Sequence, residues 1–473
     1  MINSRKTIFL TGATGNMGRE AVRQIAAKCD THRLRVLIRP EEKDHPVVGD
    51  IRRRGLAEIV WGDLTDPMSI REGVTDANAV LHVGALVSPL ADRLPPAVVT
   101  KVNVDGTRNI VDAIHAVADP KTTKLVYIGT VAETGSRNAP VHWGRCGDPV
   151  KISIYDHYAA TKTQAEAIVA QSGIAHWVSL RQSGMAHYDM WKIFDPIMFH
   201  NPVNGVFEWS SAHDSGRLMA ALCEDDLPEE LWRGFYNIGG GATSRVVNHE
   251  FMEKTMPTYR KILKPHWFAT RNFHGQWYAD SDRLETLVPF REQSLADYFE
   301  QAPKHMPWIA RLIPRLMPGA VGKRVEKLAM APEGPLHWFA HNDVDKINAY
   351  FGSRAAWEAI PRDWDAFVLA QPSREPTFLD HGYDESRSPE NWRIDDLRQG
   401  AEYRGGRCLA QSCDGPDTPV EWQSSAGWRF MMTPRLYLRG GHWCPSTMVD
   451  PTRYDAEAAR NPFFAQVWSD AAG

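Results

Sequence analysis

The stretch Thr7-Ile-Phe-Leu-Thr-Gly-Ala-Thr-Gly-Asn-Met-Gly18 decides the fold that we expect for the N-terminal half of the chain. Its first four residues form an apolar run that predicts a buried strand. Three regularly spaced glycines then end the run, before a helical pattern over residues 19–27. Gly12 and Gly15 permit a tight turn whose backbone N–H groups can approach a pyrophosphate, and Gly18 lets the helix pack closely on the sheet. The stretch therefore predicts a strand, a phosphate-binding turn and a helix.

The residues that follow alternate between strand patterns and helical patterns. Apolar runs predict further strands at residues 34–38, 60–64, 79–83 and 124–128. Parallel strands joined by helices bind ligands at the carboxyl ends of the strands. We therefore expect an α/β fold, a Rossmann-type doubly wound parallel sheet, with a smaller substrate-binding region and a C-terminal accessory domain.

Arg39 follows the second expected strand, where a site that prefers NAD usually carries an acidic residue for the ribose hydroxyls. A guanidinium group suits a 2′-phosphate instead. The sequence therefore favours NADP(H) as the cofactor, and NAD(H) is the alternative. The alternative is that Arg39 has no binding role and is a solvated loop residue.

Tyr158 and Lys162 are four residues apart in a predicted helix, and hence lie on one helix face. A phenol has a pKa of about 10, so it serves as an acid or base near neutral pH when a neighbour stabilises the phenolate. Lys162 supplies that positive charge. Thr130, at the end of a strand, can hydrogen-bond the same substrate oxygen. These three residues are the candidate catalytic residues.

Five sequence elements, taken in order, resemble the extended short-chain dehydrogenases/reductases: Thr11–Gly18, Gly62–Leu64, Asn103–Thr107, Thr130 and the Tyr158/Lys162 pair. The resemblance covers roughly the first half of the chain and implies a catalytic set of Thr130, Tyr158 and Lys162, with threonine where serine is commoner. The cofactor-binding residues that we expect are Gly12, Thr14, Gly15, Asn16, Met17, Gly18, Arg39, Asp63, Leu64, Gly84, Asn103 and Lys162.

The substrate is less well defined by the sequence. Residues 180–186 lack the Asn-Val-Tyr-Gly-Pro pattern common in related enzymes that act on sugar nucleotides, and residues 188–209 are rich in apolar side chains that predict either a substrate pocket or core packing. We expect NADP(H)-dependent interconversion of a ketone or aldehyde and an alcohol on a hydrophobic or aromatic small molecule. The alternatives are an epimerase or dehydratase acting on a nucleotide sugar, and a non-enzymatic NADP-binding scaffold or sensor.

Composition agrees with a cytoplasmic enzyme. The chain has 473 residues, of which 43% are hydrophobic and 24% charged, and its net charge is −4. There is no basic excess that would indicate nucleic acid as a partner. No apolar run approaches the roughly 18 residues of a membrane span, and the six cysteines are scattered, as expected of reduced thiols. By the family resemblance we also expect a homodimer.

The family pattern fades near residue 300, so we divide the chain into three parts. Residues 1–300 are expected to form the dehydrogenase/reductase domain, with a cofactor part at about 1–184 and a substrate part at about 185–300. Residues 301–370 are expected to form a helical accessory or lid region, and residues 371–473 a linker and a small Trp-rich module. Basic and apolar residues interleave at about 303–330, which predicts a lid, a subunit contact or peripheral membrane contact.

The C-terminal module has a faint similarity to zinc-bearing modules. Cys408, Cys413, His442 and Cys444 could supply four ligands, but no Cys-x-x-Cys pair occurs anywhere in the chain. We therefore expect no metal, and a packing module that buries Trp422, Trp428 and Trp443 against the enzyme domain or a second subunit.

Overall fold

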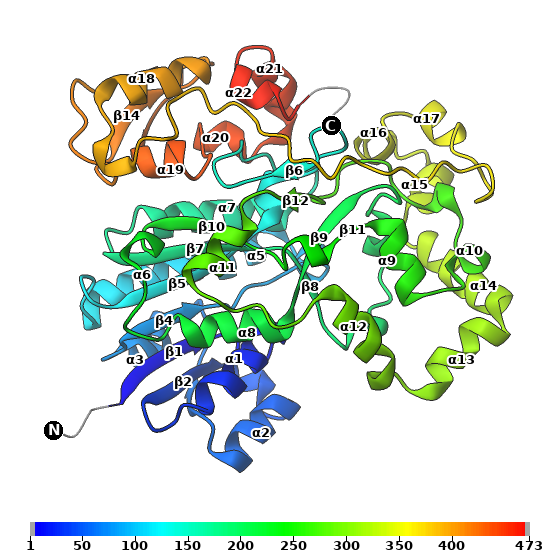
Figure 1. Cartoon of the computed structure of the whole chain (residues 1–473), viewed down its shortest axis with the longest axis horizontal. Coiled ribbons are helices and arrows are strands. Elements are labelled where there is room, and N and C mark those ends of the chain that lie inside the picture. The colour runs from blue at the N-terminus through cyan, green and yellow to red at the C-terminus, as the bar shows by residue number, and fades with distance from the viewer. Residues whose placement is uncertain (1–4, 469–473) are drawn as a thin grey trace.

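A seven-stranded parallel sheet forms the centre of the N-terminal half in the computed structural model, which describes residues 5–468 (Figure 1). The strand order is β10-β7-β5-β4-β1-β2-β3, and all neighbouring strands are parallel. The order reverses direction between β1 and β4, as in doubly wound folds. This confirms the predicted fold class. The strands are β1 (Lys6–Thr11), β2 (His32–Ile38), β3 (Glu58–Trp61), β4 (Ala79–His82), β5 (Lys124–Thr130), β7 (His176–Gln182) and β10 (Gly234–Ile238).

Helices cover both faces of this sheet, because successive side chains of each strand point to opposite faces. In β1, Phe9 packs into one core, and Ile8 and Leu10 pack into the other. The first core also receives α3 (Pro67–Val74), α6 (Gly106–Val117) and α7 (His157–Ala170). The second core receives α1 (Asn16–Ala26), α2 (Pro46–Arg54), α8 (Ala212–Ala221) and α11 (Ser281–Leu287). Two short helices, α4 (Leu90–Arg93) and α5 (Pro96–Thr100), follow β4.

The chain beyond the main sheet forms smaller units. A three-stranded sheet has the order β11-β9-β8, and a two-stranded parallel pair joins β12 to β6. These strands are β6 (Trp143–Gly144), β8 (Gly184–Ala186), β9 (Val206–Ser211), β11 (Arg245–Val247) and β12 (Trp277–Tyr278). Short helices then continue the chain: α9 (Asn248–Thr255), α10 (Tyr259–Ile262), α12 (Leu295–Gln301), α13 (Trp308–Leu316), α14 (Pro318–Ala329), α15 (Pro335–His341), α16 (Val344–Phe351) and α17 (Arg354–Glu358). Within residues 5–468, no helix has the length and apolar character needed to cross a membrane.

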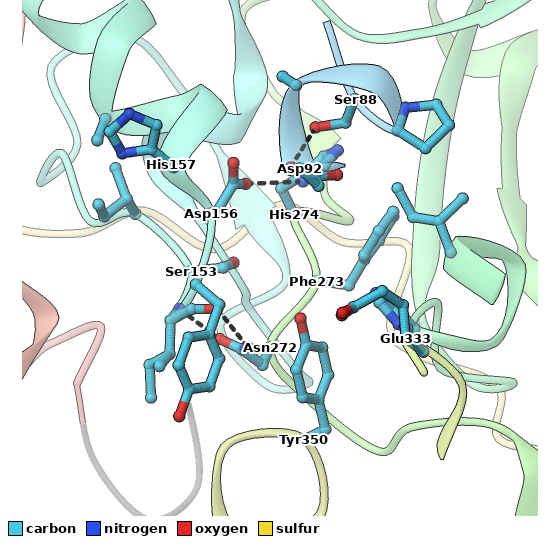
Figure 2. A pocket seen from close by; sticks show the side chains of 18 of the residues that line it. Ser88, Asp92, Ser153, Asp156, His157, Asn272, Phe273, His274, Glu333 and Tyr350 are labelled. Atoms are coloured by element: carbon cyan, nitrogen blue, oxygen red, sulfur yellow. Dashed lines mark hydrogen bonds and ion pairs between the residues drawn. The ribbon is translucent and has the colours of Figure 1, made fainter. Parts of the chain in front are cut away.

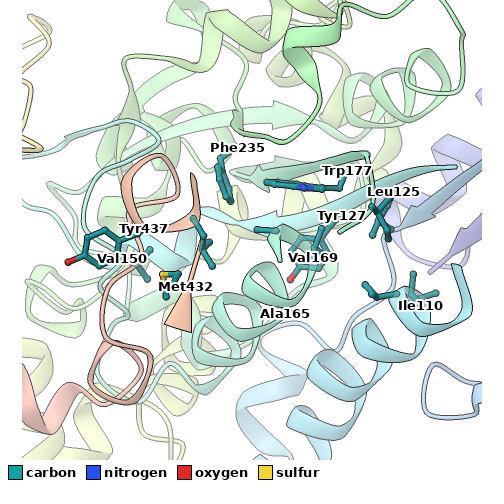
Figure 3. Packing of buried hydrophobic residues seen from close by; sticks show 14 of the residues in the cluster. Ile110, Leu125, Tyr127, Val150, Ala165, Val169, Trp177, Phe235, Met432 and Tyr437 are labelled. Atoms are coloured by element: carbon teal, nitrogen blue, oxygen red, sulfur yellow. The ribbon is translucent and has the colours of Figure 1, made fainter. Parts of the chain in front are cut away.

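The C-terminal module contains an antiparallel sheet of three strands, in the order β13-β14-β15, and five helices of its own. Its side chains belong to the same hydrophobic core as α6 and α7, and Figure 3 shows Met432 and Tyr437 close to this core. The module is therefore part of the main body of the protein. Its elements are α18 (Ile394–Tyr403), β13 (Arg407–Cys408), β14 (Val420–Gln423), β15 (Arg429–Met432), α19 (Pro434–Leu438), α20 (Pro445–Met448), α21 (Tyr454–Ala458) and α22 (Pro462–Ala465).

The tryptophans of the module differ in burial. Trp422 and Trp443 are buried, and the indole of Trp443 donates a hydrogen bond to the Val150 carbonyl at 2.8 Å. Trp428, in contrast, is 56% exposed in the single chain, so it does not pack against the enzyme domain, and its burial against a second subunit stays a prediction. The reason is local: Trp428 directly follows the turn at Gly427, between two antiparallel strands, and its ring extends into solvent.

Replacing Trp443 by alanine is expected to lower the free energy of unfolding by about 3–5 kcal/mol, because it empties a packed site and leaves the Val150 carbonyl unpaired. Trp428→Ala is the matched control and should change the value by less than about 0.5 kcal/mol. Urea denaturation measures both. Equal losses in the two variants would contradict the view that the module shares the core of the main domain.

Candidate active site

A cavity of about 450 Å³ lies at the carboxyl ends of the central strands. Twelve of the fourteen predicted site residues line it, and the exceptions are Asn103 and Thr130. We call this cavity the cofactor cleft. The predicted residues that line it are Gly12, Thr14, Gly15, Asn16, Met17, Gly18, Arg39, Asp63, Leu64, Gly84, Tyr158 and Lys162.

The glycines of the first turn are required by close backbone approaches. Gly12 has a φ of 75°, and a Cβ atom there would lie 2.7 Å from the backbone of Gly84. A Cβ atom on Gly18 would lie 2.0 Å from the Gly12 carbonyl oxygen. The Gly15 N–H donates to that same oxygen at 3.1 Å and closes the turn. No side chain of these glycines obstructs the backbone at the N-terminus of α1, which can therefore approach a phosphate group, as the glycine spacing predicts.

Arg39 lines the cofactor cleft but is paired with an acid that the sequence analysis missed. Its guanidinium donates to Glu42 at 3.1 Å, and the Thr14 hydroxyl donates to the same carboxylate oxygen at 3.0 Å. Glu42 also lines the cleft. The sequence signal for Glu42 was its position three residues after Arg39, which places the two side chains within reach of each other. A 2′-phosphate bound by Arg39 would have to displace or neutralise this carboxylate.

Tyr158 stands in the first turn of α7 because of the cap of that helix. The Asp156 side chain accepts a hydrogen bond from the Ala159 N–H at 2.8 Å, which fixes the start of the helix. Thr130 does not line the cleft, but its side chain is near enough to the Tyr158 phenol to favour the phenolate, which opposes the effect of burial on the pKa. Burial raises the pKa of Tyr158, so the phenol is protonated at neutral pH.

Lys162 lies one turn further along α7 and is 4% exposed. Its ammonium group lies 4.2 Å from the centre of the Tyr127 ring. Burial lowers the pKa of Lys162 to about 8, and the charges of Glu133 and Glu166 act in the opposite direction. The predicted stabilisation of a Tyr158 phenolate by Lys162 stays a prediction.

Beneath the catalytic residues lies a buried polar cluster, which we call the Glu166 cluster: Glu133, Glu166, Arg181 and His442. Arg181 binds Glu166 through two hydrogen bonds of 3.0 and 2.5 Å and lies 3.6 Å from Glu133. The ring of His442, from the C-terminal module, lies 2.9 Å from Glu166. Glu133 in turn accepts a hydrogen bond from the Thr130 N–H at 3.3 Å. Burial, followed by the charge of Glu166, raises the pKa of Glu133.

Asn103 does not line the cofactor cleft. Its side chain is buried, donates to the Leu86 carbonyl and the Thr161 hydroxyl, each at 3.0 Å, and accepts from the Leu86 N–H at 2.8 Å. All three hydrogen bonds join the Asn103 amide to other groups of the protein. Asn103 thus acts on the cleft indirectly, by holding Leu86, which does line it.

A second cavity of about 470 Å³ adjoins the start of α7 (Figure 2). Residues 86–93 separate it from the cofactor cleft, since Leu86, Val87 and Leu90 line the cleft whereas Ser88 and Asp92 line the second cavity. The Asp92 carboxylate accepts a hydrogen bond from Ser88 at 3.0 Å, and burial followed by the charge of Asp156 raises its pKa. The sequence analysis missed this cavity, whose walls come from segments far apart in the chain.

The polar groups of the second cavity are incompletely paired. The Ser153 hydroxyl is buried and has no hydrogen-bond partner in the described part of the chain. Asp156, besides capping α7, lies 3.7 Å from the His274 ring. Figure 2 shows these side chains facing the same space. The lining of the cavity combines acceptors such as Asp92 and Asp156 with donors such as Arg93 and Lys346.

The apolar residues between 188 and 209 mostly do not line either cavity. Phe199, Val206 and Phe207 are buried core, and Phe194 is 61% exposed. Only Ile197 among these apolar side chains lines the second cavity. Of the two interpretations of this stretch, core packing is therefore the better one. The stretch contains two short 3₁₀ helices: Met190–Lys192 has no buried residue, and Pro196–Phe199 buries Pro196 and Phe199.

Within residues 5–468, the one group of three potential metal ligands with atoms within 4.8 Å of one another is Glu133, Glu166 and His442. His442 thus belongs to the Glu166 cluster, and Cys408, Cys413 and Cys444 are not members of this group. The Arg181 guanidinium already supplies the positive charge there.

Comparison with known proteins agrees with this geometry. Residues 9–176 match the model of the 3-beta hydroxysteroid dehydrogenase/isomerase family. Human 3 beta-hydroxysteroid dehydrogenase type 7 is 25% identical over 173 residues, 36% of this chain and 45% of the relative. Ceramide reductase of Caulobacter vibrioides is 34% identical over 114 residues, 24% of this chain and 32% of the relative. The chain thus spans less than half the length of these relatives.

Solved structures support the fold. A dTDP-glucose 4,6-dehydratase from Streptomyces venezuelae, with NAD and TYD bound, is 19% identical with a TM-score of 0.51, and the match covers 66% of this chain and 99% of that one. A double mutant of the same enzyme gives a TM-score of 0.50 at 18% identity, over 66% of this chain and 98% of that chain. In its N-terminal part the chain resembles a dehydrogenase family and has the fold of these structures, in agreement with the predicted resemblance to the extended short-chain dehydrogenases/reductases.

Gly18→Ala is expected to lower the free energy of unfolding by about 1–3 kcal/mol, because its Cβ atom would overlap the Gly12 carbonyl oxygen. The matched control is Gly49→Ala in α2, where a Cβ atom meets no other atom within 4 Å. The control should stabilise the helix by up to about 1 kcal/mol. Chemical denaturation measures both, and a neutral Gly18→Ala variant would contradict the close approach at the cleft.

Proposed function

We propose that the protein is an oxidoreductase that uses NADP(H) to interconvert a ketone or aldehyde and an alcohol on a hydrophobic small molecule. The observation that carries the proposal is that Tyr158 and Lys162 line the same cleft as the glycine turn. When bound, a nicotinamide cofactor supplies or accepts the hydride. Gly12, Gly15 and Gly18 would hold its phosphates, because their backbone is free of obstructing side chains.

Tyr158 carries the proton in this proposal. Its pKa is raised by burial, so the phenol retains its proton near neutral pH and can donate it to a carbonyl oxygen as the hydride arrives. The reverse reaction needs a phenolate, which burial opposes. In the reverse direction the same side chain would take the proton back from the alcohol, with Lys162 as the neighbouring positive charge. Thr130 would help to orient the phenol.

An apolar substrate is supported from two sides. Leu86, Val87, Leu90 and Met185 line the cofactor cleft together with Tyr158. The names of two relatives, a 3 beta-hydroxysteroid dehydrogenase and a ceramide reductase, denote a steroid and a lipid.

Two alternatives have less support. The dehydratases of similar structure act on a nucleotide sugar by name, but their identity to this chain is below 20% and their likeness concerns the fold. A scaffold without activity would not need a phenol inside the cleft.

The homodimer and the cytoplasmic location stay predictions. The C-terminal module already occupies part of the outer face of α7, where Gln171 accepts from the Thr433 N–H at 3.2 Å.

Tyr158→Phe is expected to lower turnover of a hydrophobic ketone by about 10²–10⁴-fold and to leave NADPH affinity unchanged, because it removes the transferable proton and keeps the ring. Tyr403→Phe, in the C-terminal module, is the control and should retain activity. Steady-state kinetics and fluorescence titration supply the two readouts. Full activity of the Tyr158 variant would contradict the proposal.

Cofactor choice is tested at the Arg39/Glu42 pair. Arg39→Asp should weaken NADPH binding at least about tenfold more than NADH binding, since the guanidinium is the proposed contact of the 2′-phosphate. Glu42→Gln should strengthen NADPH binding, because it removes the carboxylate that competes for Arg39. Titration of both cofactors measures these changes. Equal weakening of NADPH and NADH by Arg39→Asp would rule out the assignment.

A further inference from the structure

Helix α13 turns its apolar side to solvent. None of its nine residues is buried. The five large apolar side chains of the helix are between 39% and 69% exposed, and Met317 directly after it is 58% exposed. We call this the α13 apolar surface: Trp308, Ile309, Leu312, Ile313, Leu316 and Met317.

The orientation of α13 is the opposite of what a soluble protein normally adopts. Its apolar residues follow one another at intervals of one, three and four positions, which places them on one side of the helix. Ala310 and Pro314, on the other side, are the partly buried residues. A helix of this pattern ordinarily buries its apolar stripe, and a contiguous exposed stripe marks an interaction site.

The surroundings of the α13 apolar surface are strongly basic. Residues 303–330 contain six basic side chains and one acidic side chain, Glu326, a net charge of +5 with histidine neutral, in a chain whose total is −4. Arg311 and Arg315 flank the stripe on α13 itself, and all six basic side chains are exposed. The six are Lys304, Arg311, Arg315, Lys323, Arg324 and Lys327.

The surface stands beside the cofactor cleft without covering it. No residue of α13 or α14 lines either described cavity. The ring of His305, three residues before α13, stacks on Tyr188 with ring centres 4.0 Å apart. Tyr188 directly follows His187, which lines the cleft. Figure 1 shows α13 at the edge of the molecule, joined through α12 to the region of β8. In this structure α13 and α14 therefore do not cover the cleft, and a lid formed by residues 301–370 stays a prediction.

We propose that α13 and α14 form a docking surface for an anionic lipid membrane. The apolar stripe would enter the boundary of headgroups and acyl chains, with Trp308 at its end, and the basic side chains would contact lipid phosphates. A second copy of this chain fits less well. A symmetric contact through this surface would bring two regions of net charge +5 against each other. The inference does not depend on the proposed function, although a membrane beside the cleft would suit an apolar substrate.

Vesicle co-sedimentation of the full chain tests the proposal. Vesicles of phosphatidylcholine with about 30 mol % phosphatidylserine are compared with phosphatidylcholine alone, at low and high salt. The wild type is expected to bind the anionic vesicles, with binding reduced at high salt. The double variant Leu312→Ser/Leu316→Ser should bind at least about tenfold more weakly. Lys323→Gln/Arg324→Gln should weaken binding to anionic vesicles and leave any weak binding to neutral vesicles unchanged.

Val368→Ser/Phe378→Ser is the matched control, because these side chains are 80% and 64% exposed and lie outside the α13 apolar surface. It should bind as the wild type does. All four substituted apolar side chains are exposed, and thermal denaturation will verify that each variant is folded. Absence of wild-type binding, or equal binding by the Leu312/Leu316 variant, would overturn the proposal. A wild-type dimer that this variant converts to a monomer, without vesicle binding, would assign the surface to self-association instead.

Discussion

Burying the Glu166 carboxylate requires partners from several parts of the chain at once. A buried charge is tolerated when it is paired and hydrogen-bonded. Glu166 obtains Arg181 and Ser179 from β7 and His442 from the C-terminal module. Arg181 also binds the Gly440 carbonyl at 2.7 Å. The catalytic helix, the main sheet and the module are therefore joined at one buried point.

This junction extends to the catalytic residues. Glu133 lies 3.6 Å from Arg181 and accepts a hydrogen bond from the Thr130 N–H. The turn that contains Thr130 is therefore connected to the Glu166 cluster. The carboxylates of Glu133 and Glu166 also act on Lys162, whose burial would otherwise favour its neutral form further. The C-terminal module is thus a structural support of the site through His442, although it contributes no side chain to the wall of the cofactor cleft.

The parts of this structure that the sequence predicted depend on local spacing. The glycine turn works because Gly12 and Gly18 approach backbone atoms closely, and Tyr158 and Lys162 share a helix face by their separation alone. The second cavity and the role of His442 escaped prediction because each depends on contacts between distant segments. Glu42, three residues after Arg39, was within reach of the local sequence. The local sequence left open whether the apolar residues near Phe199 line a pocket or the core. Composition marks a side chain as apolar, but the tertiary fold decides whether it faces core, cavity or solvent.

The central claim is that the cleft beside Tyr158 binds a nicotinamide dinucleotide in reach of the catalytic phenol. The most direct test is a titration of the purified wild-type protein with NADPH and with NADH, in which nicotinamide fluorescence reports binding. Native mass spectrometry first establishes whether the site is empty. The account predicts saturable binding of one dinucleotide per chain, with NADPH the tighter ligand. A protein that arrives without cofactor and binds neither dinucleotide would contradict it.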